Sequence, residues 1–286
     1  MEIAVVLINY NLAKYTIECI RSILASDVHA ISIVLVDNGS LETDVEELEA
    51  ALPGIPVIRI PENIQCAGGL NVGIQHALET PATRVFILNN DTIVETSAIR
   101  LLRASSWDVA VPKILYAEDP NIVWSAGARW RVFPPMVLMR GNRKHDSPEY
   151  DSPCQLDYAT GCAFMIKREV FEKIGLFDED FGCYQEDWDF FYRVKAGGYH
   201  TGYVPQARIL HRVSLTLGKY PANRRYNLAR NMVHFYLKEN RFQHWQLYSY
   251  IVWVLLREFI KGNLFHLPDY WHGFREGLKI WARRPS

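Results

Sequence analysis

Short apolar runs alternate with segments of helical period along the first 115 residues. Residues 3–8 form an unbroken apolar run, and the segment after it repeats apolar side chains at the spacing of a helix. An unbroken run suits a strand buried on both faces, whereas a period of about 3.6 residues suits a helix with one buried face. The pattern predicts strands in residues 2–10, 31–40, 55–61, 84–91 and 108–115, and helices in residues 12–26, 42–52, 68–79 and 96–104.

This alternation is typical of the α/β class and predicts a parallel sheet with right-handed crossover helices. The rhythm changes after Pro112. Residues 116–157 hold five prolines with little periodicity, so we expect loops and short strands there. The rest of the sequence predicts a strand and then a helix that begins near Lys167, a helix over residues 185–198, two short strands over residues 199–211, and helices from Asn223 onward.

The composition is that of a globular protein with a sizeable core, at 286 residues with 49% hydrophobic and 22% charged side chains. The five cysteines are odd in number and form no CxxC pair, which favours a reducing compartment. The first residues lack the pattern of a signal peptide. The longest apolar run, Leu247–Leu256, is about half of the roughly 20 residues that a spanning helix needs. We therefore expect a cytoplasmic protein.

Charge is distributed unevenly along the chain. Residues 219–286 hold 12 Lys and Arg against 4 Asp and Glu, a balance of +8, whereas the preceding residues hold 19 against 28, a balance of −9. The basic residues of this tail alternate with aromatic and aliphatic ones. Two interpretations are open: helices that lie on an anionic membrane surface as a peripheral contact, or a helical subdomain whose apolar face packs on the core.

Polar side chains follow three of the expected strands at the point where each strand ends. These clusters are Asn9–Asn11, Asp37–Ser40 and Asn89–Asp91. In open parallel sheets, ligands bind beyond the carboxyl ends of the strands. A single cluster would suggest only a turn, since Asn and Asp hydrogen-bond their own backbone. Three clusters in one sheet predict a shared site.

Several kinds of nucleotide site do not fit this sequence. A dinucleotide site needs GxGxxG directly after the first strand, where this chain has "NYNLAK" without a glycine. No P-loop is present. A nucleotidyltransferase would likewise need a glycine-rich loop at the first strand to admit a triphosphate. No feature indicates a nucleic-acid partner.

An ordered series of motifs resembles the inverting glycosyltransferases of family 2, and most of all their bacterial rhamnosyltransferase-like branch. The resemblance covers about residues 3–235. It rests on "VVLINYN", "IVLVDNGS", "ENIQCAGGLNVGI", "FILNNDT", "ATGCAFMIKREVFEKIGLFDEDF", "EDWDFFYRVKAGGY" and "HR", in that order.

The resemblance implies the A-type glycosyltransferase fold, a Rossmann-like, mostly parallel sheet flanked by helices, here with a C-terminal helical extension. It also implies a nucleotide-diphosphate sugar donor and Mg²⁺ or Mn²⁺. On this basis residues 1–112 form the donor-binding half and residues 113–217 the acceptor-binding and catalytic half. Residues 218–286 form the helical segment.

Asn89-Asn90-Asp91 matches the DxD-type motif of that family, with Asn in the first acidic position. The resemblance makes Asp91 the metal ligand, because a divalent cation neutralises the leaving diphosphate. Asp37 matches the base-reading aspartate, since its carboxylate or the neighbouring backbone can accept the imide N–H of uracil or thymine. A turn-forming role for either aspartate is the alternative. The expected nucleotide pocket comprises Asn9, Asn11, Asp37, Asn89 and Asn90.

Gly68, Gly69 and Asn71 lie at an expected helix start, where glycines let the backbone approach an anionic ligand. They are also candidates for nucleotide binding. Gln65 stands where the family commonly has glycine. A simple loop-to-helix turn is the alternative interpretation.

The "EDWD" segment matches the position of the catalytic base in the family. Inversion requires a carboxylate that takes the proton of the acceptor hydroxyl, and the resemblance assigns this role to Asp187. Glu186 points about 100° away on a helix and is a diphosphate or acceptor candidate, whereas Asp189 is expected to be structural.

His211 matches a late histidine of the family that resembles a second metal or diphosphate contact. Arg212, Arg225 and Arg230 are candidate phosphate partners, because guanidinium groups fit oxyanions. They could equally belong to the basic tail. Trp124 is a candidate for packing against a sugar ring, with apolar core as the alternative.

The resulting hypothesis is inverting transfer of rhamnose from dTDP-rhamnose to a lipid-linked acceptor or cell-surface glycan, at the cytoplasmic face of a membrane. A UDP-hexose donor is the main alternative. A nucleotidyltransferase and a catalytically silent sugar-nucleotide-binding protein are alternatives from other classes.

Overall fold

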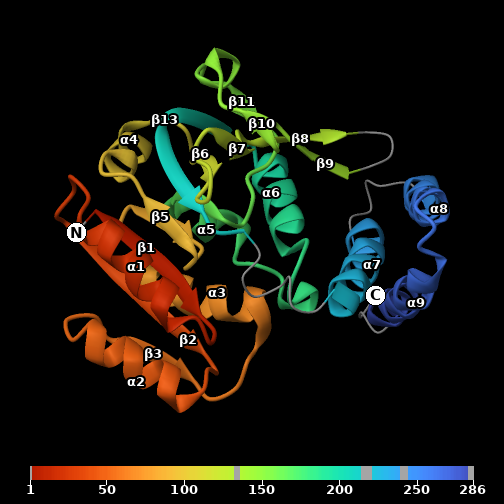
Figure 1. Cartoon of the computed structure of the whole chain (residues 1–286), viewed down its shortest axis with the longest axis horizontal. Helices are drawn as coiled ribbons and strands as arrows, with labels where there is room; N and C mark the ends of the chain where they lie inside the picture. Colours follow the sequence, from red (N-terminus) through yellow and green to blue (C-terminus); the bar gives the residue numbers. More distant parts are fainter. Residues whose placement is uncertain (1, 132–135, 214–220, 239–243, 283–286) are drawn as a thin grey trace.

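The computed structural model describes residues 2–131, 136–213, 221–238 and 244–282, and every structural statement below concerns these residues. Within them, eleven strands form one mixed sheet and two short strands pair separately. Helices cover both faces of the large sheet, and a group of C-terminal helices lies to one side of it (Figure 1).

The strands of the large sheet follow the apolar runs of the sequence. They are β1 (Ile3–Asn9), β2 (Ile31–Asn38), β3 (Val57–Ile60), β4 (Arg84–Leu88), β5 (Thr92–Val94), β6 (Val109–Tyr116), β7 (Ile122–Ser125), β10 (Lys144–His145), β11 (Gln155–Leu156), β12 (Ala163–Lys167) and β13 (Thr201–His211). The separate pair is β8 (Ala128–Arg131) and β9 (Met136–Met139).

The sheet is mixed, in agreement with the expected fold and its mostly parallel sheet, and the first strands of the chain form its parallel part. Strands β3, β2, β1 and β4 are parallel neighbours, as expected for the alternating first part of the chain. Strand β12 is antiparallel and lies between β4 and β6. It reaches that place from the irregular region after residue 116, where no regular crossover helix fixes a parallel direction.

Two short strands were expected in residues 199–211, but the structure has one strand, β13. Its pairing with β6 shifts register between Val204 and Arg208. Pro205 lies inside this shift and has no N–H to donate, so the ladder is interrupted there without ending the strand.

Helices pack on the two faces of the sheet as the alternation of strand side chains requires. One face of the sheet is covered by α1 (Ala13–Leu24), α2 (Glu42–Ala51) and α4 (Ala98–Ala104). The other face is covered by α3 (Gln65–Glu79), α5 (Arg168–Ile174) and α6 (Glu186–Ala196). Helix α5 begins next to Lys167, as predicted. Helix α3 begins three residues earlier than expected, so Gly68 and Gly69 are its fourth and fifth residues.

The C-terminal helices are α7 (Pro221–Lys238), α8 (His244–Ile260) and α9 (Leu267–Ala282). Their buried side chains form a separate apolar cluster around Phe235, which also takes in Phe181 from the loop before α6. Trp188 and Tyr192 of α6 pack against this cluster. Among the described helices none has the length and hydropathy that a membrane span requires.

Candidate active site

The three polar clusters predicted from the sequence lie at one edge of the sheet. Strands β1 and β2 are parallel and in register, so that Asn9 at the end of β1 is paired with Asp37. Strand β4 runs parallel on the other side of β1 and ends at Leu88, directly before Asn89. The common direction of the strands therefore brings the clusters together.

Hydrogen bonds connect these clusters through Asn9, whose side chain is fully buried. Its Nδ2 donates to Asp37 Oδ1 at 2.9 Å and to Asp44 Oδ2 at 2.7 Å. Its Oδ1 accepts from Thr16 Oγ1 at 2.8 Å, and Thr16 Oγ1 accepts from Asn90 Nδ2 at 2.8 Å. A buried network whose polar groups are hydrogen-bonded to one another fixes the relative positions of the strand ends.

Asp37 is 2% exposed, and both of its carboxylate oxygens accept hydrogen bonds within the chain. Oδ2 accepts from the backbone N–H of Ser40 at 3.0 Å, which is the turn contact that the alternative interpretation anticipated. A carboxylate has about four acceptor positions, so these contacts leave capacity for a ligand donor. Asn11 links the neighbouring loops, because its Oδ1 accepts from the N–H of Leu41 at 2.8 Å.

The glycines of α3 pack closely against the strand ends. A Cβ on Gly69 would lie 3.1 Å from Nδ2 of Asn38 and 3.2 Å from Cδ1 of Ile8. A Cβ on Gly68 would lie 3.1 Å from Cδ1 of Ile64. Gln65 takes up a left-handed conformation (φ 67°) where the family commonly has glycine.

Asn71 is engaged away from the strand ends. Its Nδ2 donates to the carbonyl of Phe177 at 2.9 Å and to Glu179 Oε1 at 2.8 Å, and its Oδ1 accepts from the N–H of Phe177 at 3.0 Å. This side chain ties α3 to the loop before α6. Its hydrogen-bond partners thus lie outside the cluster of Asn9, Asp37 and Asn90.

Asp91 and His211 meet at the end of two paired strands. Strand β13 is antiparallel to β5, with His211 opposite Thr92, and the backbone N–H of Arg212 donates to the carbonyl of Asp91 at 2.9 Å. His211 Nε2 consequently lies 3.2 Å from Asp91 Oδ1, and both residues are buried. The ring of Trp124 packs edge-on against that of His211 at 4.5 Å.

The donor set at Asp91 and His211 fits a divalent cation. Asp91 Oδ1 is buried and, within the described part of the chain, accepts no hydrogen bond. A carboxylate oxygen beside an imidazole nitrogen suits Mn²⁺ or Mg²⁺, which complete their coordination with phosphate oxygens and water. Nearby, Arg212 forms an ion pair with Glu18 at 2.6 Å and lies over the ring of Tyr15.

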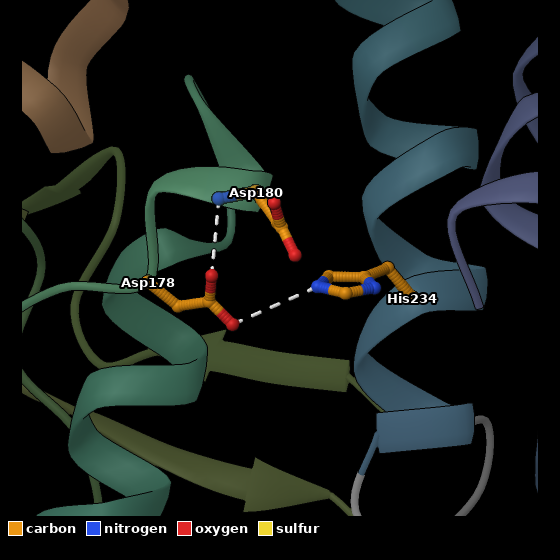
Figure 2. Close-up of side chains that lie close together, drawn as sticks. All are labelled: Asp178, Asp180 and His234. Carbon is orange, nitrogen blue, oxygen red and sulfur yellow. Dashed lines mark hydrogen bonds and ion pairs between the residues drawn. The ribbon is translucent and has the colours of Figure 1, made fainter. Parts of the chain in front are cut away.

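A second group of ligand-type side chains lies between the loop before α6 and α7. Oxygens of Asp178 and Asp180 and a nitrogen of His234 lie within 4.8 Å of one another (Figure 2). The ammonium of Lys238 is 2.7 Å from Asp178 Oδ2 and already supplies a cation. Burial alone would raise the pKa of Asp178, but its interactions with His234 and Lys238 outweigh this effect and hold the pKa far below its usual range. We therefore assign these residues to an ion-pair network.

Asp187 stands in the first turn of α6, and two donors hold its Oδ2. Its Oδ2 accepts from the hydroxyl of Tyr158 and from the backbone N–H of Gly161, the latter at 3.0 Å. Burial raises the pKa of Asp187, although these hydrogen bonds favour the ionised form. A raised pKa makes a carboxylate with fixed orientation a stronger base, which suits a group that accepts a proton.

Glu186 is buried beside Asp187, and its Oε2 has no hydrogen-bond partner within the described residues. Burial, and then the charge of Asp187, raise the pKa of Glu186 well above its usual range. Asp189 is fully buried between Arg193 and Lys238, which agrees with its expected structural role.

The structure does not bring Arg225 and Arg230 to the strand ends. Arg225 Nε binds Asp269 of α9 at 2.8 Å. Arg230 donates to the carbonyl of Phe181 and, through Nε, to Asn231 Oδ1 at 2.7 Å. Both guanidinium groups therefore bind other parts of the chain.

Sequence reasoning missed several residues at this site. Thr16 and Asp44 complete the network around Asn9, and Tyr158 and Gly161 hold Asp187. Tyr158 and Gly161 lie in the "YATGC" stretch. The sequence signal that could have indicated them is the position of this stretch, between an irregular region and a predicted strand.

The sequence profile of Glycosyl transferase family 2 matches residues 4–175, more than half of the chain. The chain belongs to this family. It is a glycosyltransferase, and the family match favours transfer of a sugar over the nucleotidyltransferase alternative.

Two named relatives are similar along most of this glycosyltransferase. It is 25% identical over 218 residues to the low-salt glycan biosynthesis hexosyltransferase Agl10 of Haloferax volcanii, covering 73% of this chain and 67% of that protein. It is 22% identical over 246 residues to the N-acetylglucosaminyl-diphospho-decaprenol L-rhamnosyltransferase of Mycobacterium tuberculosis, covering 77% and 78%.

Solved structures show that the fold is the A-type glycosyltransferase fold. GalNAc-T7 with UDP, GalNAc and Mn²⁺ matches with a TM-score of 0.60 at 17% identity; the match covers 82% of this chain but half of that one. The mannosyltransferase PcManGT of Pyrobaculum calidifontis, in complex with GDP-Man and Mn²⁺, matches with a TM-score of 0.58 at 15% identity and covers 98% and 86%.

Proposed function

We propose that this family 2 glycosyltransferase moves a sugar from a nucleotide-diphosphate donor to a hydroxyl acceptor, with inversion at the anomeric carbon. The observation that carries the proposal is the buried pair of Asp91 Oδ1 and His211 Nε2, at the sheet edge that also holds Asp37. The complexes of GalNAc-T7 with UDP and Mn²⁺, and of PcManGT with GDP-Man and Mn²⁺, support a donor of this class.

The nucleotide is proposed to lie across the ends of β1 and β2. Asp37 has acceptor capacity beyond its contacts with Asn9 and Ser40, and an imide N–H of uracil or thymine is a suitable donor for it. Asn9 holds this carboxylate in place from inside the protein, and Asn11 braces the rim of the pocket through Leu41.

Asp91 and His211 are the residues proposed to hold a divalent cation, Mg²⁺ or Mn²⁺. When bound, such an ion neutralises the negative charge of the diphosphate leaving group. The Asn at position 89 leaves the motif with one carboxylate, so the two protein ligands need phosphate oxygens to complete the coordination.

Asp187 is proposed as the general base. The proton of the acceptor hydroxyl passes to its carboxylate while the oxygen bonds to the anomeric carbon and the bond to the diphosphate breaks. Tyr158 and Gly161 hold the carboxylate, and its raised pKa makes it a stronger base than an exposed aspartate. Burial, and then the charge of Asp187, raise the pKa of Glu186 well above its usual range, which favours the protonated form of Glu186 beside an ionised Asp187.

Rhamnose from dTDP-rhamnose is the donor that we propose first, supported by the similarity to the rhamnosyltransferase of Mycobacterium tuberculosis. The similarity to the hexosyltransferase Agl10 supports a UDP-hexose donor as a second candidate. The decaprenol in the name of the Mycobacterium tuberculosis rhamnosyltransferase supports a lipid-linked acceptor.

The C-terminal helices are proposed to rest on an anionic membrane surface on the cytoplasmic side. Exposed apolar side chains follow one another on α8 at helical spacing, whereas Leu247, Tyr250 and Val254 face the core. The exposed set comprises Trp245, Tyr248, Val252, Leu255, Leu256, Phe259 and Ile260. A basic segment with such a face suits the interface of a membrane with anionic lipids.

Product analysis tests the proposal. The protein is incubated with Mn²⁺, a polyprenyl-diphosphate N-acetylglucosamine acceptor, and either dTDP-rhamnose or a UDP-hexose, and the anomeric configuration of the product is determined by NMR. We expect an inverted linkage. Asp187→Asn should lower kcat by about 10²–10⁴-fold, whereas Asp27→Asn, which breaks a surface ion pair with Arg100, should not. Retention of configuration, or release of pyrophosphate from a nucleoside triphosphate and a sugar phosphate, would contradict the proposal.

A further inference from the structure

A single side chain of α7 holds the loop that leads into the catalytic helix α6. Asn231 is fully buried, and the two N–H groups of its Nδ2 are shared among the carbonyls of Phe181 at 2.8 Å, Cys183 at 2.9 Å and Tyr184 at 2.6 Å. Its Oδ1 accepts from Arg230 Nε at 2.7 Å. Because a guanidinium can only donate, this contact fixes which end of the amide faces the loop.

The carbonyls that Asn231 binds belong to a backbone in an unfavourable conformation. Tyr184 and Gln185 both have positive φ, 71° and 65°, and Gln185 directly precedes Glu186 and Asp187. Residues other than glycine adopt this conformation at a cost, and two in succession persist only where the surroundings hold them. The contacts to the amide of Asn231 supply that restraint on the side of α7.

The same face of α7 also binds both flanks of this loop. Lys238 Nζ lies 2.7 Å from Asp178 Oδ2 before the loop and also pairs with Asp189 after it. His234 Nε2 lies 3.7 Å from the same oxygen of Asp178, and Figure 2 shows this imidazole pointing from α7 toward the loop. The loop is thus fixed at its two ends and in its middle.

We propose that Asn231 is a positioning residue for catalysis: it holds residues 181–185 in the left-handed turn that places the Asp187 carboxylate against Tyr158 and Gly161. This inference rests on the proposed role of Asp187 as the base. The alternative is that Asn231 contributes only to the stability of the packing between α7 and the rest of the chain.

The test compares Asn231→Ala with Asp269→Asn. The latter breaks the ion pair between α9 and Arg225 of α7 and leaves the loop untouched. For each variant we would measure the melting temperature, kcat, and KM for the sugar-nucleotide donor. We expect Asn231→Ala to lower kcat at least about tenfold with KM changed less than about threefold, since a misplaced base slows the chemical step while the donor pocket is intact. Asp269→Asn should lower the melting temperature with kcat within about twofold of wild type.

Asn231→Leu serves as a second variant, because it removes the donors to the loop carbonyls while it fills the space that Asn231→Ala leaves empty. A glycine substitution tests directly whether Asn231 acts through the backbone conformation of the loop. Glycine adopts positive φ without strain, so Gln185→Gly combined with Asn231→Leu should recover part of the lost kcat. The inference is overturned if kcat of the Asn231 variants follows melting temperature as in Asp269→Asn, or if Gln185→Gly restores nothing. Asp187→Asn is assayed in parallel: full activity of that variant refutes the base assignment itself.

Discussion

Asp91 Oδ1 lies 3.2 Å from Nε2 of His211, although the two residues belong to segments far apart in the sequence. The antiparallel pairing of β5 with β13 sets His211 opposite Thr92, the neighbour of Asp91. Asp91, which directly precedes the shorter strand, thus supplies the carboxylate, and the last residue of the longer strand supplies the imidazole. This contact joins the sheet edge that holds Asp37 to the strand that precedes the C-terminal helices.

Removal of the His211 imidazole should raise the Mn²⁺ concentration that the reaction requires. His211→Phe keeps an aromatic ring against Trp124 but removes the nitrogen that faces Asp91. We expect half-maximal activity to require about 10–100-fold more Mn²⁺, because one ligand is lost. The check is a Mn²⁺ titration of initial rate at saturating donor. His76→Phe, at an exposed pair with Glu79, is the control and should leave the titration unchanged.

The pH dependence of the reaction should depend on Tyr158. Burial raises the pKa of Asp187, and the hydroxyl of Tyr158 opposes this effect by favouring the carboxylate. A base loses activity as pH falls through its pKa. Tyr158→Phe removes the opposing contact, so the acid limb of the profile of kcat/KM against pH should move to higher pH. Tyr203→Phe, which removes a buried hydrogen bond to the carbonyl of Tyr150, should leave that limb in place. A shift to lower pH in Tyr158→Phe would contradict the assignment.

Cys183 should be the most reactive of the cysteines near neutral pH. A hydrogen bond from the thiol of Cys66 is the main cause that lowers the pKa of Cys183 to about 7, whereas burial raises the pKa of Cys19 to about 12. Since the thiolate is the nucleophile, alkylation of Cys183 by iodoacetamide should rise around pH 7. Peptide mass spectrometry measures this, and Cys66→Ala, which removes the donor to Cys183, should move the rise to higher pH. Faster labelling of Cys19 would contradict the prediction.

The exposed apolar face of α8 should provide much of the protein's affinity for lipid vesicles. Phe259 and Ile260 are 67% and 81% exposed. Phe259→Glu with Ile260→Glu should reduce co-sedimentation with vesicles that contain anionic lipid by about tenfold or more, because apolar burial is lost and like charge is added. Leu24→Glu changes an exposed apolar residue at the end of α1 and should bind as wild type. Equal recovery of both variants with vesicles would refute the membrane contact.

The first part of the fold could be predicted from the sequence because its elements depend on local pattern. The buried strands around Val5 and Leu35 and the helices between them follow from periodicity alone, and the parallel pairing of Asn9 with Asp37 follows from their alternation. The antiparallel insertion of β12 could not be predicted, since its position depends on long-range pairing with β4 and β6.

The candidate active site likewise contains residues that the sequence predicts and residues that it does not. Polar residues at strand ends such as Asn9, Asp37 and Asp91 are visible in the sequence as clusters after apolar runs. The partners of Asp187 are not, because Tyr158 and Gly161 reach it only through the packing of α6 on the sheet. Asn231 gave no signal either, since an asparagine within a helix takes on its role only where the helix meets a loop.

The most direct test of the account is the thermal stability of the protein with UDP or dTDP in the presence and absence of Mn²⁺. A ligand that binds the native state raises the melting temperature by mass action. For the wild type we predict that either nucleotide with Mn²⁺ raises the melting temperature more than nucleotide or Mn²⁺ alone, and that Asp91→Asn loses this additional increase. An equal increase in wild type and Asp91→Asn would contradict the placement of the cation at Asp91 and with it the central claim.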